Sequence, residues 1–185
     1  MNMPKRISVL SLLALLAACG SGASDTQKPN GATAPAAPSP ELTKLVLASQ
    51  PAGAVSVLEA KKLATADACA VSGRIANIVP GFAVLKLMDS SLPYCGEKNK
   101  EGNCKTPWDY CCESKDTQTS HSLLVEVRDA NGKPIAGNVG DLRLLDAITV
   151  AGRLTKDEHG NHVLLATGWH RDTRPELPDH VKWPQ

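Results

Sequence analysis

Two five-residue segments decide the fold: Val71-Ser72-Gly73-Arg74-Ile75 and Val150-Ala151-Gly152-Arg153-Leu154. In each segment apolar residues alternate with small or polar ones, a pattern typical of a strand with one buried face. Each also has a central glycine, which weakens a strand and usually marks a bulge or a sharp bend of the sheet. A barrel that closes between its first and fourth strands needs such bends. The two segments therefore predict a five-stranded OB-fold barrel, a small Greek-key fold.

Other apolar patterns supply three more strands and a leading helix. A run that is apolar on both faces over 82–88 predicts the second strand, and alternation over 123–128 and 163–167 predicts the third and fifth. Ser56 and Glu59 have the spacing of a capping box, which predicts a short helix from residue 57 to residue 64. The apolar side chains of this helix are expected in the core: Val57, Leu58 and Leu63. An unclosed five-stranded sandwich with similar patterning is the alternative to a closed barrel.

The fold class is accordingly all-β with a short N-terminal helix. We expect the OB-fold domain over 57–172, with an insert at 90–121 between its second and third strands. A lead-in segment at 41–56 precedes the domain, and a C-terminal tail at 173–185 follows it. About 115 residues are enough for a single hydrophobic core.

The helix, the first strand and residues 82–89 together resemble a bacterial OB-fold family of small periplasmic proteins. Members of that family have a short helix leading into a barrel whose first strand carries a glycine. They join the second and third strands by a tight turn, whereas this chain inserts about thirty residues there. The insert, with Thr106-Pro107-Trp108-Asp109-Tyr110-Cys111-Cys112, is similar to uncharacterised bacterial lipoproteins. That likeness implies no activity.

The N-terminus predicts export and lipid anchoring. Lys5 and Arg6 precede an apolar run that ends in small residues directly before Cys19. A positive region followed by about a dozen apolar residues predicts a signal peptide over 1–18. Its end resembles the lipobox of bacterial lipoproteins, which implies that Cys19 carries fatty acids such as palmitate and anchors the chain to a membrane. Residues 19–40 are rich in Pro, Ala, Gly and Ser and are expected to form a disordered tether.

These features predict a lipid-anchored protein of the cell envelope. Gly20, which follows the lipidated cysteine, indicates the periplasmic face of the outer membrane if the organism is Gram-negative. Without Lys5 and Arg6 the chain has 18 basic and 19 acidic residues, a net charge of −1. Nucleic-acid binding is therefore not expected, because its affinity comes mainly from clustered positive charge.

Four cysteines lie within eighteen residues of the insert: Cys95, Cys104, Cys111 and Cys112. An exported chain meets oxidising conditions, so we expect two disulfides that staple the loop. A bond between adjacent Cys111 and Cys112 has poor geometry, which leaves two possible pairings open. The alternative is a zinc or copper site formed by these thiolates, or by three of them with His121. Thiol–disulfide exchange, helped by Lys105, is a third possibility.

The leading functional hypothesis is a non-catalytic binding or scaffolding module without a cofactor. OB barrels commonly bind ligands along their second and third strands, where the insert emerges. We therefore expect Trp108 and Tyr110 to contact an envelope protein or glycan. Metal binding is the first alternative, and binding of single-stranded nucleic acid or an oligosaccharide, by analogy with other OB folds, is the second. The sequence contains no catalytic motif, so an enzyme is not expected. Cys69 is expected to be a buried free thiol in the first strand.

Overall fold

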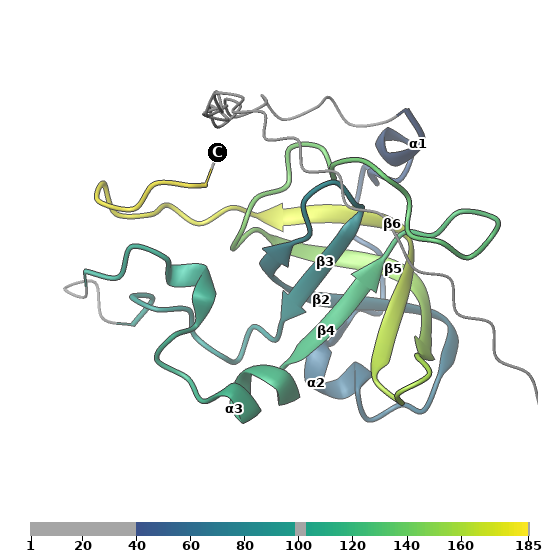
Figure 1. Cartoon of the computed structure of the whole chain (residues 1–185), viewed down its shortest axis with the longest axis horizontal. Coiled ribbons are helices and arrows are strands. Elements are labelled where there is room, and N and C mark those ends of the chain that lie inside the picture. Colours follow the sequence, from purple (N-terminus) through teal and green to yellow (C-terminus); the bar gives the residue numbers. More distant parts are fainter. Residues whose placement is uncertain (1–39, 99–102, 185) are drawn as a thin grey trace, which may run out of the picture. The chain divides into compact units, whose positions relative to one another are not determined.

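The computed structural model describes residues 40–98 and 103–184 (Figure 1). The predicted signal peptide, Cys19 with its predicted lipidation, and almost all of the predicted tether lie outside these residues. Within the described ranges, no helix has both the length and the apolar character needed to cross a bilayer.

The described chain contains short helices and six strands. In chain order they are α1 (Pro40–Thr43), β1 (Val55–Ser56), α2 (Val57–Ala60), β2 (Ala66–Ile78), β3 (Val84–Met88), the 3-10 helix η1 (Pro107–Asp109), α3 (Lys115–Ser120), β4 (Ser122–Glu126), β5 (Ala147–Lys156) and β6 (His162–Thr173).

Strands β2 to β6 form a closed five-stranded barrel. The strand order is β2-β3-β4-β6-β5, and pairing of β2 with β5 closes the ring. All neighbours are antiparallel except β4 and β6, which run parallel. The predicted fold class is confirmed, and the barrel is consistent with an OB fold. Because β1 precedes the barrel, the predicted second and third strands are β3 and β4, and the insert follows β3 and leads into β4.

The barrel interior follows the predicted alternation in three strands. Val71 and Ile75 of β2, Leu123 and Val125 of β4, and Ile148, Val150 and Leu154 of β5 are buried in the main core. In β6 the expected inward set Val163, Leu165 and Thr167 is only partly right. Leu164 lies in the main core, and Thr167 is exposed because the register between β5 and β6 shifts at this point.

The two strand glycines sit where backbones approach closely. A Cβ atom on Gly73 would lie 2.8 Å from the carbonyl oxygen of Met88, and one on Gly152 would overlap the backbone of Leu165. Gly152 also lies at the irregularity between β5 and β6. Both positions thus require glycine because another backbone approaches closely, and the predicted strand irregularity is present at Gly152.

Helix α2 begins as predicted and ends early. Ser56 and Glu59 form both hydrogen bonds of the capping box. The buried carboxylate of Asp89 adds a third cap, because it accepts the Leu58 N–H at 2.8 Å. The helix stops at Ala60, and Leu63, expected in the core, is 43% exposed. The expectation for Leu63 was wrong because the chain turns before reaching the position that would bury it.

The segments on either side of the domain also pack on it. In the lead-in, Leu47 donates its N–H to the carbonyl of Trp169 at 2.7 Å, and Trp169 donates to Leu45 at 2.8 Å. In the tail, Arg174 binds the fully buried carboxylate of Asp146 through two hydrogen bonds of 2.7 Å. The C-terminal tail therefore belongs to the folded domain.

Candidate metal centre

A second hydrophobic cluster holds the insert against the barrel. Its buried members come from β2, β3, the insert, the loop before β5 and the C-terminal tail: Ala76, Met88, Leu92, Trp108, Tyr110, Leu145 and Val181. The insert and the tail lie at the same side of the barrel (Figure 1). Although the insert is rich in polar residues, this cluster gives it a core of its own.

This packing corrects the role expected for the two aromatic residues. Trp108 is 8% exposed and Tyr110 is 1% exposed. Neither ring can therefore form an exposed recognition surface. Their main contribution is apolar burial, which positions the backbone that carries the cysteines.

The chain reverses at Tyr110 and so presents the adjacent cysteines. Tyr110 has a left-handed backbone with a φ of 49° directly after η1. Gln118, buried in α3, fixes this turn by donating hydrogen bonds to the carbonyls of Tyr110 at 2.9 Å and Glu113 at 3.1 Å. Cys111 and Cys112 follow the turn and are exposed.

The loop that carries Cys95 is held by the barrel itself. Arg74 of β2 forms a bidentate ion pair with Glu97, with distances of 2.6 and 3.2 Å. The Arg74 guanidinium also lies 5.4 Å from the centre of the Tyr94 ring. On the other side, the Cys95 N–H donates to the carbonyl of Pro107 at 3.2 Å. Cys95 is thus fixed by contacts on both sides and is buried.

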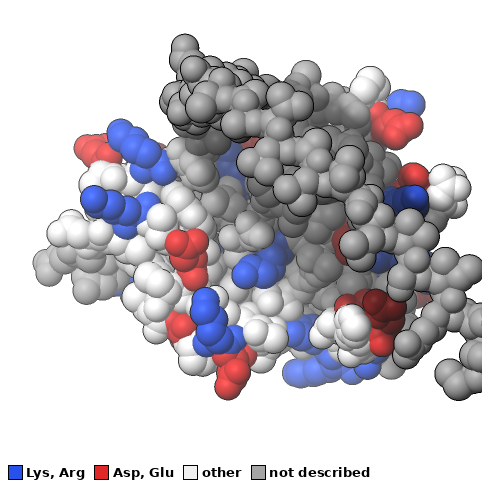
Figure 2. Space-filling view, viewed as in Figure 1, with Lys and Arg blue, Asp and Glu red and all other residues white. Residues whose placement is uncertain are grey.

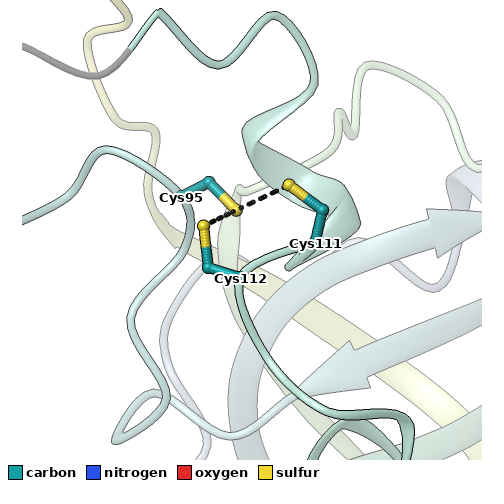
Figure 3. A group of neighbouring side chains, drawn as sticks. All are labelled: Cys95, Cys111 and Cys112. Carbon is teal, nitrogen blue, oxygen red and sulfur yellow. Dashed lines mark hydrogen bonds between the residues drawn. The ribbon is translucent and has the colours of Figure 1, made fainter.

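These constraints bring the predicted cysteines together. The Sγ atom of Cys95 lies 3.4 Å from that of Cys111 and 3.5 Å from that of Cys112 (Figure 3). All three Sγ atoms lie within 4.8 Å of one another. The Sγ atom of Cys104 lies 4.0 Å from that of Cys111. We call Cys95, Cys104, Cys111 and Cys112 the cysteine cluster.

The sulfur separations resemble those around a metal ion. Sulfurs bound to one tetrahedral zinc at about 2.3 Å stand about 3.8 Å apart, whereas a disulfide requires about 2.05 Å. The contacts of 3.4, 3.5 and 4.0 Å lie near the first value. All described cysteines are free thiols here, so the disulfides stay a prediction.

The other predicted ligand does not join the cluster. His121 ends α3, where its Nδ1 is 2.9 Å from the carbonyl oxygen of Thr117. The described group with metal-binding geometry contains only cysteines, without His121. Cys69 is also elsewhere. It is half-buried instead of buried, and its Sγ lies 3.6 Å from the Gly152 carbonyl.

The thiols of the cluster differ in acidity. Burial alone would raise the pKa of Cys95, but its contacts with the Cys112 N–H and with the neighbouring thiols outweigh burial and lower it. Contacts with Cys95 and Cys104 raise the pKa of Cys111 to about 12, and contact with Cys95 raises the pKa of Cys112. Among Cys95, Cys111 and Cys112, Cys95 is therefore the thiol that ionises first.

The Tyr110 hydroxyl is a hydrogen-bond donor near the cysteine cluster. It is buried and has no hydrogen-bond partner among the described residues. Burial raises the pKa of Tyr110 to about 12, with smaller opposing effects from Arg74 and further raising by Glu97 and Cys95. The Tyr110 hydroxyl therefore remains protonated at neutral pH.

A cleft of about 410 Å³ separates the insert from the outer face of the barrel. Asn77 of β2 and Lys86 of β3 line one side, and Trp108, Cys111 and Lys115 line the other. On the face shown in Figure 2, acidic and basic side chains of the described residues are interspersed. Where described residues are visible on that face, they form no long basic track of the kind that nucleic acid requires.

Comparison of the chain with protein-family models and with curated proteins gave no match. The resemblance to small periplasmic OB-fold proteins therefore stays a prediction. The evidence for the site is its own geometry.

Sequence reasoning identified the four cysteines but missed the residues that position them. Arg74 stands in the strand segment that decides the fold, yet its ion pair with Glu97 joins residues 23 positions apart. Helix α3, with the sequence Lys-Asp-Thr-Gln-Thr-Ser, has no apolar periodicity that could reveal it. The Ser114 cap, whose side chain accepts the Thr117 N–H, was the available signal.

Proposed function

We propose that this protein is a lipid-anchored, non-catalytic binding module of the cell envelope whose cysteine cluster binds a soft metal ion, zinc or Cu(I). The observation that carries the proposal is the set of short sulfur–sulfur distances around Cys95. Thiolates are the ligands that both ions favour.

The cluster also has the acidity pattern that metal binding needs. A thiol must lose its proton to bind a metal, so binding is easiest to start where the pKa is lowest. Of Cys95, Cys111 and Cys112, only Cys95 has a lowered pKa, and its loop is held by the Arg74–Glu97 pair and by Pro107. Cys111 and Cys112 are exposed, so an ion from solution can reach the cluster and complete its coordination.

The test uses the purified full-length protein in detergent, reduced with a phosphine under anaerobic conditions. Zn²⁺ or Cu(I) is added separately, unbound ion is removed, and metal per chain is measured by elemental analysis. We expect stoichiometric retention by the wild type and by the control variant Cys69→Ser, which lacks a barrel cysteine outside the cluster. Retention by Cys95→Ser should be lost.

Measuring the affinity of each variant for the metal makes the same test quantitative. Cys95→Ser should weaken binding by more than the 10–100-fold typical of losing an outer-shell partner. Circular dichroism shows whether the variant keeps its β structure. Absence of metal from the folded wild type, or equal affinity of Cys95→Ser and Cys69→Ser, would overturn the proposal.

The cleft favours a second candidate, binding of an envelope glycan or protein. It lies on the outer face of β2 and β3 and carries Lys86 and Lys115. OB barrels often bind ligands along their second and third strands, and β3, the second strand of this barrel, contributes Lys86 to the cleft. Purified cell-wall glycan should bind the wild type more tightly than Lys86→Glu if the ligand is acidic, and equal binding would exclude this use of the cleft.

A further inference from the structure

The cysteine cluster has two possible chemical forms, because the four sulfurs that would bind a metal are also close enough to oxidise. We propose that, when it holds no metal, the cluster closes into two nested disulfides, Cys95–Cys112 and Cys104–Cys111. This pairing stands whether or not the proposed metal binding is right, and if both hold, oxidation and metal binding exclude each other.

The distances select one of the two pairings that the sequence leaves open. Cys95 is nearly equidistant from its two neighbours, at 3.4 Å from Cys111 and 3.5 Å from Cys112. Cys95 alone therefore does not decide the pairing. Cys104 decides it. Its side chain is near Cys95 as well, but a Cys95–Cys104 bond would leave the adjacent Cys111 and Cys112 to pair with poor geometry, whereas its sulfur lies 4.0 Å from that of Cys111.

Assigning Cys111 to Cys104 leaves Cys112 for Cys95, and both bonds then join sulfurs that already touch. The reverse assignment would need Cys104 to reach Cys112 past Cys111. Each chosen pair has to close by about 1.5–2 Å to reach the disulfide distance of about 2.05 Å. Rotation of the exposed side chains of Cys111 and Cys112 can supply such movements.

The reaction needs an oxidant, and a low-molecular-weight disulfide such as oxidised glutathione provides it. The Cys112 thiolate attacks the glutathione disulfide, forming a mixed disulfide and releasing one reduced glutathione. The Cys95 thiolate then attacks the Cys112 sulfur and releases the second. Two cysteine thiols are oxidised and one glutathione disulfide is reduced for each bond, so two glutathione disulfides complete both bonds. The Cys104–Cys111 bond forms in the same way.

Cys95 suits the second step. Its sulfur already lies 3.5 Å from that of Cys112, and its burial limits direct attack by an external disulfide. The exposed Cys112 is the better entry point. The bonds enclose nested loops, one joining residues 17 positions apart and the other residues 7 positions apart.

The experiment measures disulfide formation in full-length, chelator-treated protein equilibrated with glutathione redox buffers. In the wild type, partial reduction followed by cyanylation and cleavage identifies each bond, because no common protease cuts between Cys111 and Cys112. We expect both proposed bonds, with Cys69 remaining alkylatable.

Paired variants test the decisive step. Cys95→Ser/Cys112→Ser leaves Cys104 with Cys111, and Cys95→Ser/Cys111→Ser leaves Cys104 with Cys112. Equilibrium with glutathione gives the effective concentration of the two remaining thiols toward each other. We expect this value to be at least 10-fold higher in the first variant than in the second. Far-UV circular dichroism of the reduced variants checks that both keep the barrel. Equal effective concentrations, the reverse pairing in the wild type, or four free thiols after oxidation would each overturn the proposal.

A final arm separates this proposal from metal binding. Reduced protein preloaded with Cd²⁺, a redox-inert thiolate-binding ion, is exposed to the same glutathione buffer. If both proposals hold, oxidation should slow at least 10-fold relative to metal-free protein. If Cd²⁺ does not bind but the nested bonds form, the metal proposal fails and the pairing stands. If Cd²⁺ binds but the metal-free protein forms other disulfides, the proposed pairing is wrong and the metal-binding proposal is kept.

Discussion

Replacing Trp108 by Ala should destabilise the protein strongly, because this side chain fills the second hydrophobic cluster. Only 8% of the residue is exposed, and it packs in the cluster formed with Met88, Tyr110 and Val181. Trp→Ala substitutions at buried sites cost about 3–5 kcal/mol, through lost apolar burial and the cavity left behind. The insert lies at the edge of the barrel and can partly collapse into that cavity. We therefore expect a loss near the lower limit, about 3 kcal/mol.

Urea denaturation followed by far-UV circular dichroism measures this loss. Trp183→Ala is the matched control, because Trp183 is half-buried in the C-terminal tail and its Nε1–H donates to the Leu144 carbonyl at 3.2 Å. Removal of that contact should cost about 1 kcal/mol. If Trp108→Ala lowers the free energy of unfolding by no more than Trp183→Ala does, Trp108 does not hold the insert in place. The reasoning from burial would then be wrong.

Three further substitutions test other features of the fold. Tyr110→Phe removes a buried hydroxyl without a partner and should be neutral or stabilise by up to about 1 kcal/mol in thermal melts; a clear loss would show that the hydroxyl has a partner. Asp89→Asn should cost about 1–2 kcal/mol at pH 7. Burial alone would raise the pKa of Asp89, but hydrogen bonds from Ser91 and Leu58 lower it, so its stabilisation is present above about pH 4 and is lost as pH falls through the folded-state pKa. An unchanged gap between wild type and Asp89→Asn at low pH would contradict this. Gly152→Ala should prevent normal closure of β5 on β6 and lower the melting temperature, whereas Gly160→Ala, in the open hairpin loop, should cost less.

The barrel could be predicted because its signals are local. Alternation around Val71 and Val150 identifies the inward face of each strand, and the shared glycines mark the bends. Where a signal depends on register, the prediction fails. The shift between β5 and β6 exposes Thr167 and buries Leu164, although simple alternation indicates the opposite.

The candidate site was predictable in composition but not in geometry. The density of cysteines in the insert indicates that their sulfurs are neighbours, whatever holds them. Their pairing depends on the reversal at Tyr110, which is set by Gln118 and by burial against Leu145 and Val181. Those contacts join segments far apart in sequence, so no local pattern reveals them. An aromatic pair in a polar insert was therefore interpreted as a recognition surface when it is a small core.

The link between Arg74 and Glu97 makes the chemistry of the cluster depend on the barrel. Arg74 belongs to the strand whose glycine bend helps to close the barrel, and its ion pair fixes the loop that carries Cys95. Their side chains are 18% and 29% exposed, so the pair is mostly shielded from solvent, and the cost of desolvating both charges offsets part of their attraction. Its main effect is on position, because loss of the pair leaves Cys95 held chiefly through Pro107. The same contact therefore serves both proposed states of the cluster, since a metal site and a nested pair of disulfides each need Cys95 within reach of Cys112.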